Sequence, residues 1–359
     1  MTNEHTFVAI IGGGITGLAL GHHLRREGVP HLVLEASDRA GGVIRSARVD
    51  GAVLDWGPQR TRLTTALRQL LDELGIADQV ITAPPDLPLF VYFARKLRRV
   101  PFSAIDFLRS DIVPIGSKLR AILEPLTRGA DPAETVADYF SRKLGRRMYE
   151  NVAGPLYGGL YASDPANMIV GLSLGHVLAE FGVERSLVLR FLRSGGRVAP
   201  PPACSFNDGM EALPRALYAA NHENVRLNTR ALAVRQRGRE WEVETEGGTV
   251  RAEKVVLSAP AAAVADLLGL DCGGAADALR SLVYNPLAVV HLRAETPLRG
   301  LGYQVSFAER MVTRGVTFNA SMFGRTGVYT AYLGGAKAPE VVRWSDEEIG
   351  STAVREFRE

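Results

Sequence analysis

A glycine-rich turn near the N-terminus constrains the fold more than any other feature of this chain. Gly12, Gly14 and Gly17 have the G-x-G-x-x-G spacing, and they follow four apolar residues at 8–11. Such an apolar run is typical of a buried parallel strand. The first glycine permits a tight turn, the second lets the backbone approach a pyrophosphate, and the third lets the following helix lie close to the strand. The stretch therefore predicts a dinucleotide-binding strand, turn and helix.

An acidic residue completes this unit. Residues 31–34 are apolar enough for a second strand, and Glu35 follows directly. It lies near the offset of about 20 residues expected of the acid that binds an adenosine ribose. A pyrophosphate would lie at the start of the helix, at the amides of Ile15 and Thr16, where free N–H groups and the helix dipole attract anions. A glycine-rich turn without a ligand is the alternative, and the presence of all four parts disfavours it.

Composition narrows the class of protein. The chain has 359 residues, enough for two or three domains, and 46% hydrophobic and 23% charged residues are ordinary for a globular protein. A net charge of +3 is too small to argue for nucleic-acid binding. Cys204 and Cys272 are isolated, so we expect small buried side chains, a reducing compartment and no metal site. His22 and His23 are expected on the surface of the first helix.

No signal peptide is expected, because the first strand begins almost at once. No apolar run approaches the ~18 residues that span a bilayer, so we expect a soluble protein or one that lies on a membrane surface. Further along, the patterns predict a helix over 64–74 and strands over 89–93, 287–292 and 315–323.

Motifs beyond the glycine turn carry a family resemblance. They are Glu35-Ala36, Arg39-x-Gly41-Gly42 and Asp55-Trp56-Gly57-Pro58, followed by Arg60 and Arg62. This pattern resembles the N-terminal signature of the flavin amine oxidase superfamily, and the Gly-Pro step with its arginines is similar to the protoporphyrinogen oxidase branch. Four later segments also resemble that branch: 148–165, 206–214, Ala231 with its surroundings, and 255–260 with Ser258.

The resemblance implies an α/β fold, α+β overall. It consists of a Rossmann-like FAD/NAD(P)-binding domain, an inserted helical domain and a mixed-sheet substrate domain. We expect the FAD-binding domain at 1–85 and 203–280, the helical substrate- and membrane-facing domain at 86–202, and the substrate sheet at 281–359. The family has a further C-terminal segment that returns to the FAD-binding domain, so we expect this chain to be a fragment with an incomplete substrate domain.

The implied activity is FAD-dependent oxidation of protoporphyrinogen IX to protoporphyrin IX, with O2 as acceptor and H2O2 as product, in haem and porphyrin biosynthesis. Coproporphyrinogen III is the alternative substrate. Another amine oxidase or a carotenoid desaturase on the same fold stays open, as does a non-catalytic, flavin-free binding protein. By resemblance, FAD would contact the following residues: Gly12, Gly14, Ile15, Thr16, Gly17, Glu35, Ala36, Arg39, Gly41, Gly42, Gly57, Pro58, Ala231 and Ser258.

The resemblance also implies substrate-site residues. The backbone carbonyl of Gly159 would face the macrocycle nitrogens, although a helix C-cap is its structural alternative. Arg60 and Arg62 could bind propionates or form a solvated loop, and Phe323 could lie against a pyrrole ring or in the sheet core. Leu89 stands where plant and animal relatives have a propionate-binding arginine, so propionate recognition must differ here.

The expected partners are a porphyrinogen and O2, without nucleic acid. A set of apolar residues beside Arg109, Lys118 and Arg120 could bind a membrane surface, although we favour a role in the helical domain's own core. The set is Leu108, Ile112, Ile115, Leu119, Ile122 and Leu123. A homodimer stays open. We expect the protein in the cytoplasm, with peripheral contact at the inner face of the cell membrane as an option.

Overall fold

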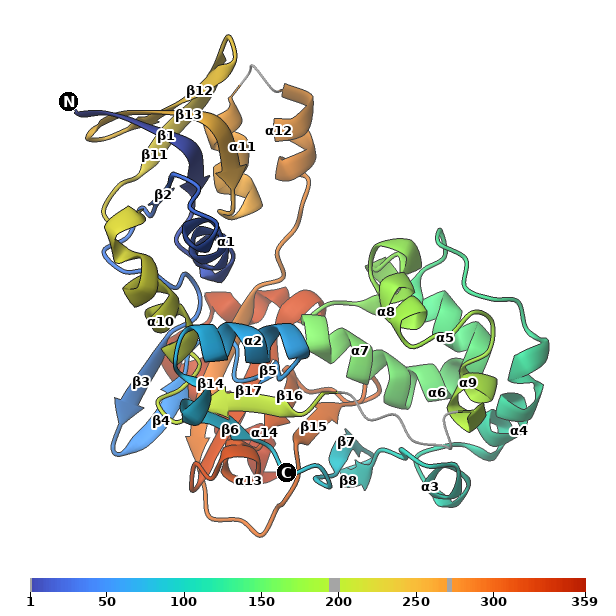
Figure 1. Cartoon of the computed structure of the whole chain (residues 1–359). Helices are drawn as coiled ribbons and strands as arrows, with labels where there is room; N and C mark the ends of the chain where they lie inside the picture. The colour runs from blue at the N-terminus through green and yellow to red at the C-terminus, as the bar shows by residue number, and fades with distance from the viewer. Residues whose placement is uncertain (1, 194–200, 270–272) are drawn as a thin grey trace. The chain divides into compact units, whose positions relative to one another are not determined.

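The computed structural model describes residues 2–193, 201–269 and 273–359, and it divides into two compact units (Figure 1). The first unit contains Met1–Thr82 and Pro202–Tyr284, and the second contains Ala83–Pro201 and Asn285–Glu359. Cys272 lies outside the described residues. Each unit is described separately below.

A six-stranded sheet forms the centre of the first unit, in the order β10-β2-β1-β13-β12-β11. The strands are β1 (Thr2–Ile11), β2 (His31–Leu34), β10 (Val225–Arg226), β11 (Ala231–Arg237), β12 (Glu240–Thr245) and β13 (Gly248–Leu257). The first four in this order are parallel, and β12 and β11 are antiparallel. Val8 and Ile10 face one apolar cluster while Ala9 and Ile11 face another, so β1 is buried on both faces as its sequence predicts.

Helices cover this sheet. They are α1 (Ile15–Arg26), α2 (Thr65–Glu73), α10 (Ala212–Asn221), α11 (Ala261–Leu268) and α12 (Gly273–Arg280). Thr64 caps α2, because its hydroxyl accepts the N–H of Leu67 at 3.2 Å. His22 on α1 is buried and bonds to Glu73 of α2 at 3.2 Å, so the expectation that it lies on the surface is wrong. Cys204 is buried, as expected.

Two smaller sheets complete the first unit. One is the hairpin of β3 (Ser46–Val49) and β4 (Ala52–Asp55). The other is a three-stranded sheet in the order β5-β9-β6, formed by β5 (Thr61–Arg62), β9 (Ala203–Phe206) and β6 (Val80–Thr82). β9 brings residues after the long insertion back into the first unit, and its side chains are all buried.

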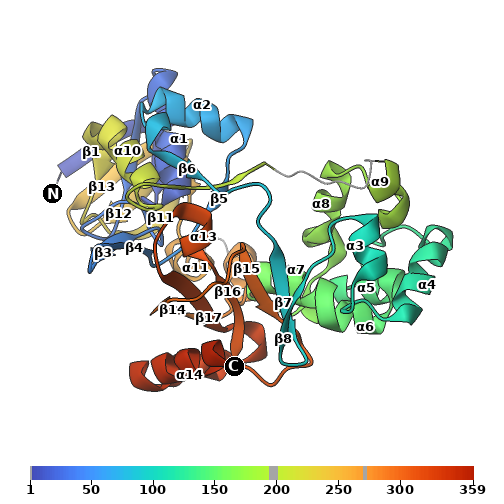
Figure 2. The same ribbon diagram turned by 90° about the horizontal axis from the view of Figure 1, so that it is seen from below.

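The second unit has a six-stranded sheet in the order β14-β17-β16-β15-β7-β8. Its strands are β7 (Leu89–Phe93), β8 (Lys96–Arg99), β14 (Leu287–Arg293), β15 (Gly302–Val305), β16 (Thr313–Thr317) and β17 (Val328–Gly334). Helix α13 (Asn319–Phe323) follows β16, and α14 (Asp346–Arg358) packs against β14 and β17 (Figure 2). The predicted strand over 315–323 therefore ends at Thr317, and Phe323 lies in a helix.

Most of the remaining helices gather at the end of this sheet beyond β7 and β8 (Figures 1 and 2). They are α3 (Ala104–Arg109), α4 (Ile115–Leu123), α5 (Val136–Leu144), α6 (Arg146–Met148), α8 (Leu174–Glu180) and α9 (Leu187–Arg193). Helix α7 (Gly154–Tyr161) packs instead against β15 and β16. A π-helical turn at Tyr149–Ala153 joins α6 to α7. Among the described residues, no helix combines the length and apolar character needed to cross a membrane.

Two features of this unit differ from expectation. β7 falls within the helical domain expected at 86–202, yet it pairs in parallel with β15 of the substrate domain expected at 281–359. The two stretches share one compact unit. The apolar side chains of α3 and α4 also differ. Ile112 is buried, but Leu108, Ile115, Leu119, Ile122 and Leu123 are exposed, so for these five the core reading is wrong.

Candidate functional site

The glycine turn of the first unit provides an open anion site. Gly12 has a φ of +112°, and its N–H donates to the Leu34 carbonyl at 2.9 Å. A Cβ at Gly17 would lie 2.0 Å from the Gly12 carbonyl oxygen, so only glycine fits there. A Cβ at Gly14 would meet no atom within 4 Å. Among the described residues no side chain caps α1, so the first amides of this helix, at Ile15 and Thr16, are available to a ligand.

Glu35 is fixed at the tip of β2, directly beside this turn. One carboxylate oxygen accepts the Gly13 N–H at 2.7 Å, and the other accepts the Ser37 N–H at 2.8 Å and the Ser37 hydroxyl at 2.7 Å. A Cβ at Gly13 would lie 2.8 Å from the Glu35 Cβ. Gly13 is therefore required for this arrangement. The glycine spacing alone gives Gly13 no role, although it is the middle residue of a Gly-Gly-Gly run.

The Gly41-Gly42 turn lies on the glycine turn. The Gly41 N–H donates to the Gly13 carbonyl at 2.8 Å, and a Cβ at Gly42 would lie 3.2 Å from the Gly14 Cα. Both glycines have positive φ, +114° and +59°. The Arg39 guanidinium donates to the Gly42 carbonyl at 2.5 Å and to two neighbouring carbonyls at 3.4 Å. Arg39 thus holds this turn in place.

Gly57 extends this stack of backbone segments. A Cβ at Gly57 would lie 2.2 Å from the Val43 carbonyl oxygen, so the turn of residues 57–58 approaches the 41–43 turn more closely than any side chain allows. Pro58 follows and is exposed, Arg60 is half-buried, and Arg62 is exposed in β5. The first unit therefore stacks three of the segments predicted to contact FAD, the turns at 12–14, 41–43 and 57–58.

Asp55 anchors these stacked turns, although the sequence motif that contains it gives it no role. Asp55 is fully buried, and one carboxylate oxygen accepts the Ser46 hydroxyl at 2.5 Å and the Met210 N–H at 2.8 Å. Glu211 accepts the Ser46 N–H at 2.8 Å. A Cβ at Gly209 would lie 2.6 Å from the same Asp55 oxygen. These bonds tie the β3–β4 hairpin to the Gly-Met segment that precedes α10.

Ser258 and Ala231 occupy supporting positions. The Ser258 N–H donates to the Ile11 carbonyl at 2.9 Å, and its hydroxyl lies 3.0 Å from the Gly12 carbonyl oxygen, so the residue fixes the glycine turn. Ala231 begins β11. The chain just before it runs beside Glu35, because the Thr229 N–H donates to the Glu35 carbonyl at 2.8 Å. Both positions fit a role in shaping the site through the backbone.

Gly159 of the second unit lies in the last turn of α7. Two amides that follow this turn, those of Ala162 and Ser163, both donate to the Gly158 carbonyl. Neither takes the Gly159 carbonyl, which can accept another donor. A Cβ at Gly159 would lie 2.0 Å from the side-chain oxygen of Gln304 on β15. The Gln304 carboxamide therefore packs directly on the Gly159 backbone, a contact between residues far apart in the sequence.

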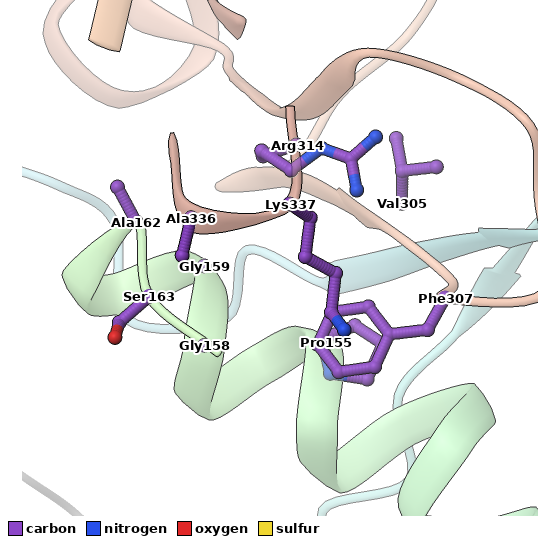
Figure 3. Close-up of a pocket in the computed structure, with 10 residues that line it drawn as sticks. All are labelled: Pro155, Gly158, Gly159, Ala162, Ser163, Val305, Phe307, Arg314, Ala336 and Lys337. Carbon is purple, nitrogen blue, oxygen red and sulfur yellow. The ribbon is translucent and has the colours of Figure 1, made fainter. Parts of the chain in front are cut away.

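A small cavity lies beside Gly159, and two cations line it (Figure 3). Its volume of about 10 Å³ is room for one water. The Lys337 ammonium lies 4.4 Å from the centre of the Phe307 ring and 2.7 Å from an Asp164 carboxylate oxygen. Arg314 lies on the other side, and burial lowers the pKa of its guanidinium below the usual range. It stays charged at neutral pH.

Phe323, the last residue of α13, is half-buried. The Arg325 guanidinium carbon lies 5.6 Å from the centre of its ring. The ring lies at the end of a helix and not in a strand, so the alternative that Phe323 belongs to a strand in the sheet core is wrong. Its role against a pyrrole ring stays a prediction, as do the roles of the other predicted site residues.

Comparison with known proteins places the chain in a family. Residues 15–359 match the family described as flavin containing amine oxidoreductase. The chain belongs to this family. It is also 26% identical to the chloroplast protoporphyrinogen oxidase of Nicotiana tabacum, over 97% of this chain and 71% of that protein. It is 28% identical to the protoporphyrinogen oxidase of Homo sapiens, over 88% of this chain and 73% of that protein.

Solved structures of the flavin-containing amine oxidoreductase fold agree with this assignment. A protein of Exiguobacterium sp. 255-15, assigned as a protoporphyrinogen oxidase, superposes with a TM-score of 0.80 at 21% identity, over 99% of this chain and 82% of that one. A putrescine oxidase superposes with a TM-score of 0.73 at 19% identity, over 99% of this chain and 81% of that one. These likenesses establish the predicted fold class.

The family makes this chain an FAD-dependent oxidoreductase, and the first unit fits that cofactor. The uncapped start of α1 and the open space at Gly14 suit a pyrophosphate, and the Glu35 carboxylate suits ribose hydroxyls. Bound FAD supplies two-electron oxidation of the substrate. The stacked glycine turns are the part of the first unit that would hold this cofactor.

Proposed function

We propose that this protein oxidises protoporphyrinogen IX to protoporphyrin IX, with three O2 reduced to three H2O2. Six electrons and six protons leave the porphyrinogen in three two-electron steps, which balances the reaction. The relatives named protoporphyrinogen oxidase, which align over 88–97% of the chain, support this substrate class. The protein would take part in haem and porphyrin biosynthesis.

The Gly159 carbonyl is the observation that carries this proposal. It lies in the last turn of α7, and the amides of Ala162 and Ser163 leave it open to a donor. Pyrrole N–H groups at the centre of a porphyrinogen are such donors. The carbonyl dipole would also stabilise the positive charge that develops on the macrocycle as a hydride leaves. The Gln304 side chain packs on the Gly159 backbone and would hold it in place.

Propionate recognition would rest on cations other than the arginine that Leu89 replaces. Arg314 lines the small cavity beside Gly159 in the second unit, where Lys337 is already paired with Asp164, and Arg60 and Arg62 lie in the first unit. Arginine binds carboxylates in a bidentate way. This supply of cations favours coproporphyrinogen III as a second candidate, because that substrate carries four propionates.

The test is aerobic incubation of the FAD-loaded protein with each porphyrinogen, followed by porphyrin fluorescence. We expect porphyrin formation well above the rate of autoxidation, and a higher kcat/KM for protoporphyrinogen IX. Heat-inactivated protein measures the autoxidation rate. A higher kcat/KM for coproporphyrinogen III would transfer the proposal to the second candidate. Failure to oxidise either porphyrinogen, with oxidation of an amine such as putrescine instead, would reject the proposal.

We also propose peripheral contact with the cytoplasmic face of the cell membrane. Exposed apolar side chains of α3 and α4 lie among Arg109, Lys118 and Arg120, which suits an anionic membrane surface. The exposed side chains are Ile105, Leu108, Ile115, Leu119, Ile122 and Leu123. Such contact would serve a poorly soluble substrate. Sedimentation with anionic vesicles tests it, and a protein that stays in the supernatant would contradict it.

A further inference from the structure

A large apolar cavity lies among the helices of the second unit, outside the residues assigned to oxidation. Residues of α3, α4, α5, α8 and α9 line it, and its volume is about 960 Å³. This is the upper end of the roughly 300–1,000 Å³ typical of ligand sites. Among the described residues that line it, only Ser103, Lys118 and Arg190 are polar, and none is acidic. A ligand there would be largely apolar.

The mouth of the cavity is apolar and exposed. Leu108, Ile122 and Leu192 line the cavity and are 65%, 72% and 55% exposed to solvent. Neighbouring side chains on α3 and α4 that lie outside the cavity, such as Ile115 and Leu119, are exposed as well. An apolar opening surrounded by an apolar surface suits a ligand that enters from a bilayer and not from water.

A buried ion pair fixes the helices that form the walls of the cavity to one another. Lys143 of α5 lies 2.9 Å from a Glu124 carboxylate oxygen, and both side chains are fully buried. Glu124 also accepts the Ser186 hydroxyl and the N–H groups of Leu187 and Val188, which begin α9. The cavity-lining helix α9 is thus fixed to α5 and to the end of α4. The cavity is preformed.

Two cations at the cavity select the charge of the ligand. The Lys118 ammonium donates to the Leu108 carbonyl at 2.7 Å, and the Arg190 guanidinium donates to the Phe181 carbonyl. In the described part of the chain neither is paired with an acid. An ammonium has three donors and a guanidinium five, so both retain capacity for an anion. Cations beside an apolar cavity match an amphiphile with an anionic head group.

We propose that this cavity binds the acyl chains of an anionic phospholipid, with the phosphate held by Lys118 and Arg190. The volume and the exposed apolar mouth favour a phospholipid over a dissolved fatty acid. The site is separate from the residues that would bind FAD and from Gly159. The proposal therefore does not depend on the identity of the oxidised substrate, and its test measures lipid binding alone.

The test uses the FAD-loaded protein taken from nanodiscs of phosphatidylcholine and phosphatidylglycerol and examined by native mass spectrometry. We expect one retained phosphatidylglycerol per chain. Ala121→Trp fills the cavity, because Ala121 is a buried lining residue of α4, and should lower retention at least tenfold. Leu172→Trp is the matched control, because Leu172 is 88% exposed and lies outside both the cavity and the apolar surface of α3 and α4, and it should retain the lipid.

The double variant Lys118→Gln, Arg190→Gln tests the head-group contact without changing any core side chain. We expect it to lose the preference for phosphatidylglycerol over phosphatidylcholine. Equal retention by Ala121→Trp and Leu172→Trp, an unchanged head-group preference in the double variant, or displacement of the lipid by equimolar oleate would each overturn the proposal.

Discussion

The absence of a side chain at Gly159 lets Gln304 pack directly on the backbone whose carbonyl we propose to face the substrate. We expect Gly159→Ala to lower kcat/KM for the porphyrinogen about 100-fold, because the new Cβ would lie 2.0 Å from the Gln304 oxygen and must disrupt this packing. The double variant Gly159→Ala, Gln304→Ala removes that obstacle and should recover much of the loss. Porphyrin fluorescence measures both variants. Equal activity of the single variant and the unmodified protein would contradict this role.

Glu35 is predicted to bind the ribose of FAD through its charged carboxylate. With FAD bound, the Glu35 carboxylate would accept hydrogen bonds from the ribose hydroxyls. A hydrogen bond to a charged acceptor contributes roughly 1.5–3 kcal/mol to the free energy. We therefore expect Glu35→Gln to weaken FAD binding by about one to two orders of magnitude, measured by calorimetric titration of the flavin-free protein. Glu27→Gln, at the exposed end of α1, is the control and should bind FAD unchanged. An equal loss in both variants would contradict a ribose contact.

The β3–β4 hairpin depends on one buried carboxylate. Asp55 accepts bonds from Ser46 and Met210, so Asp55→Ala leaves buried donors without their acceptor. We expect a loss of about 3 kcal/mol in the free energy of unfolding, together with weaker FAD retention. Urea unfolding measures the first effect. Asp38→Ala, at an exposed position, should change stability by less than about 0.5 kcal/mol. A similar small change for Asp55→Ala would contradict the anchoring role.

The buried Glu124 carboxylate, which joins α5 to α9, should make the free energy of unfolding depend on pH in the acid range. Burial alone would raise the pKa of Glu124, but hydrogen bonds from Ser186 and Lys143 and the charge of Lys143 hold it below its ordinary value of 4.5. Because the unfolded state then binds the proton first, this stabilisation is complete above pH 4.5 and declines as the pH falls through the folded pKa.

We expect Glu124→Gln to remove that dependence and to cost about 3–5 kcal/mol at pH 7, since it leaves the buried Lys143 ammonium without its counter-charge. Urea unfolding between pH 3 and 7 measures both effects. Glu184→Gln, at an exposed position, is the control. If the free energy of unfolding of Glu124→Gln still falls at low pH as in the unmodified protein, other carboxylates cause the pH dependence.

Across the whole molecule, the sequence predicts features that depend on neighbouring residues, but it does not predict contacts between distant segments. The glycine turn, Glu35 and the cap of α2 follow from residues within one strand-turn-helix segment or one helix end. The pairing of β7 with β15 joins residues more than 200 positions apart, and the packing of Gln304 on Gly159 depends on it. The exposed face of α4 has the amphipathic pattern of a core helix, so its sequence alone favoured burial.

The most direct test of the account is anaerobic reduction of the bound flavin by protoporphyrinogen IX, followed through the flavin absorbance. The proposed function predicts that the substrate bleaches the flavin, that admitting O2 restores it, and that three H2O2 form for each porphyrin. A flavin that stays oxidised in the presence of either porphyrinogen, but is bleached by an amine, would contradict it.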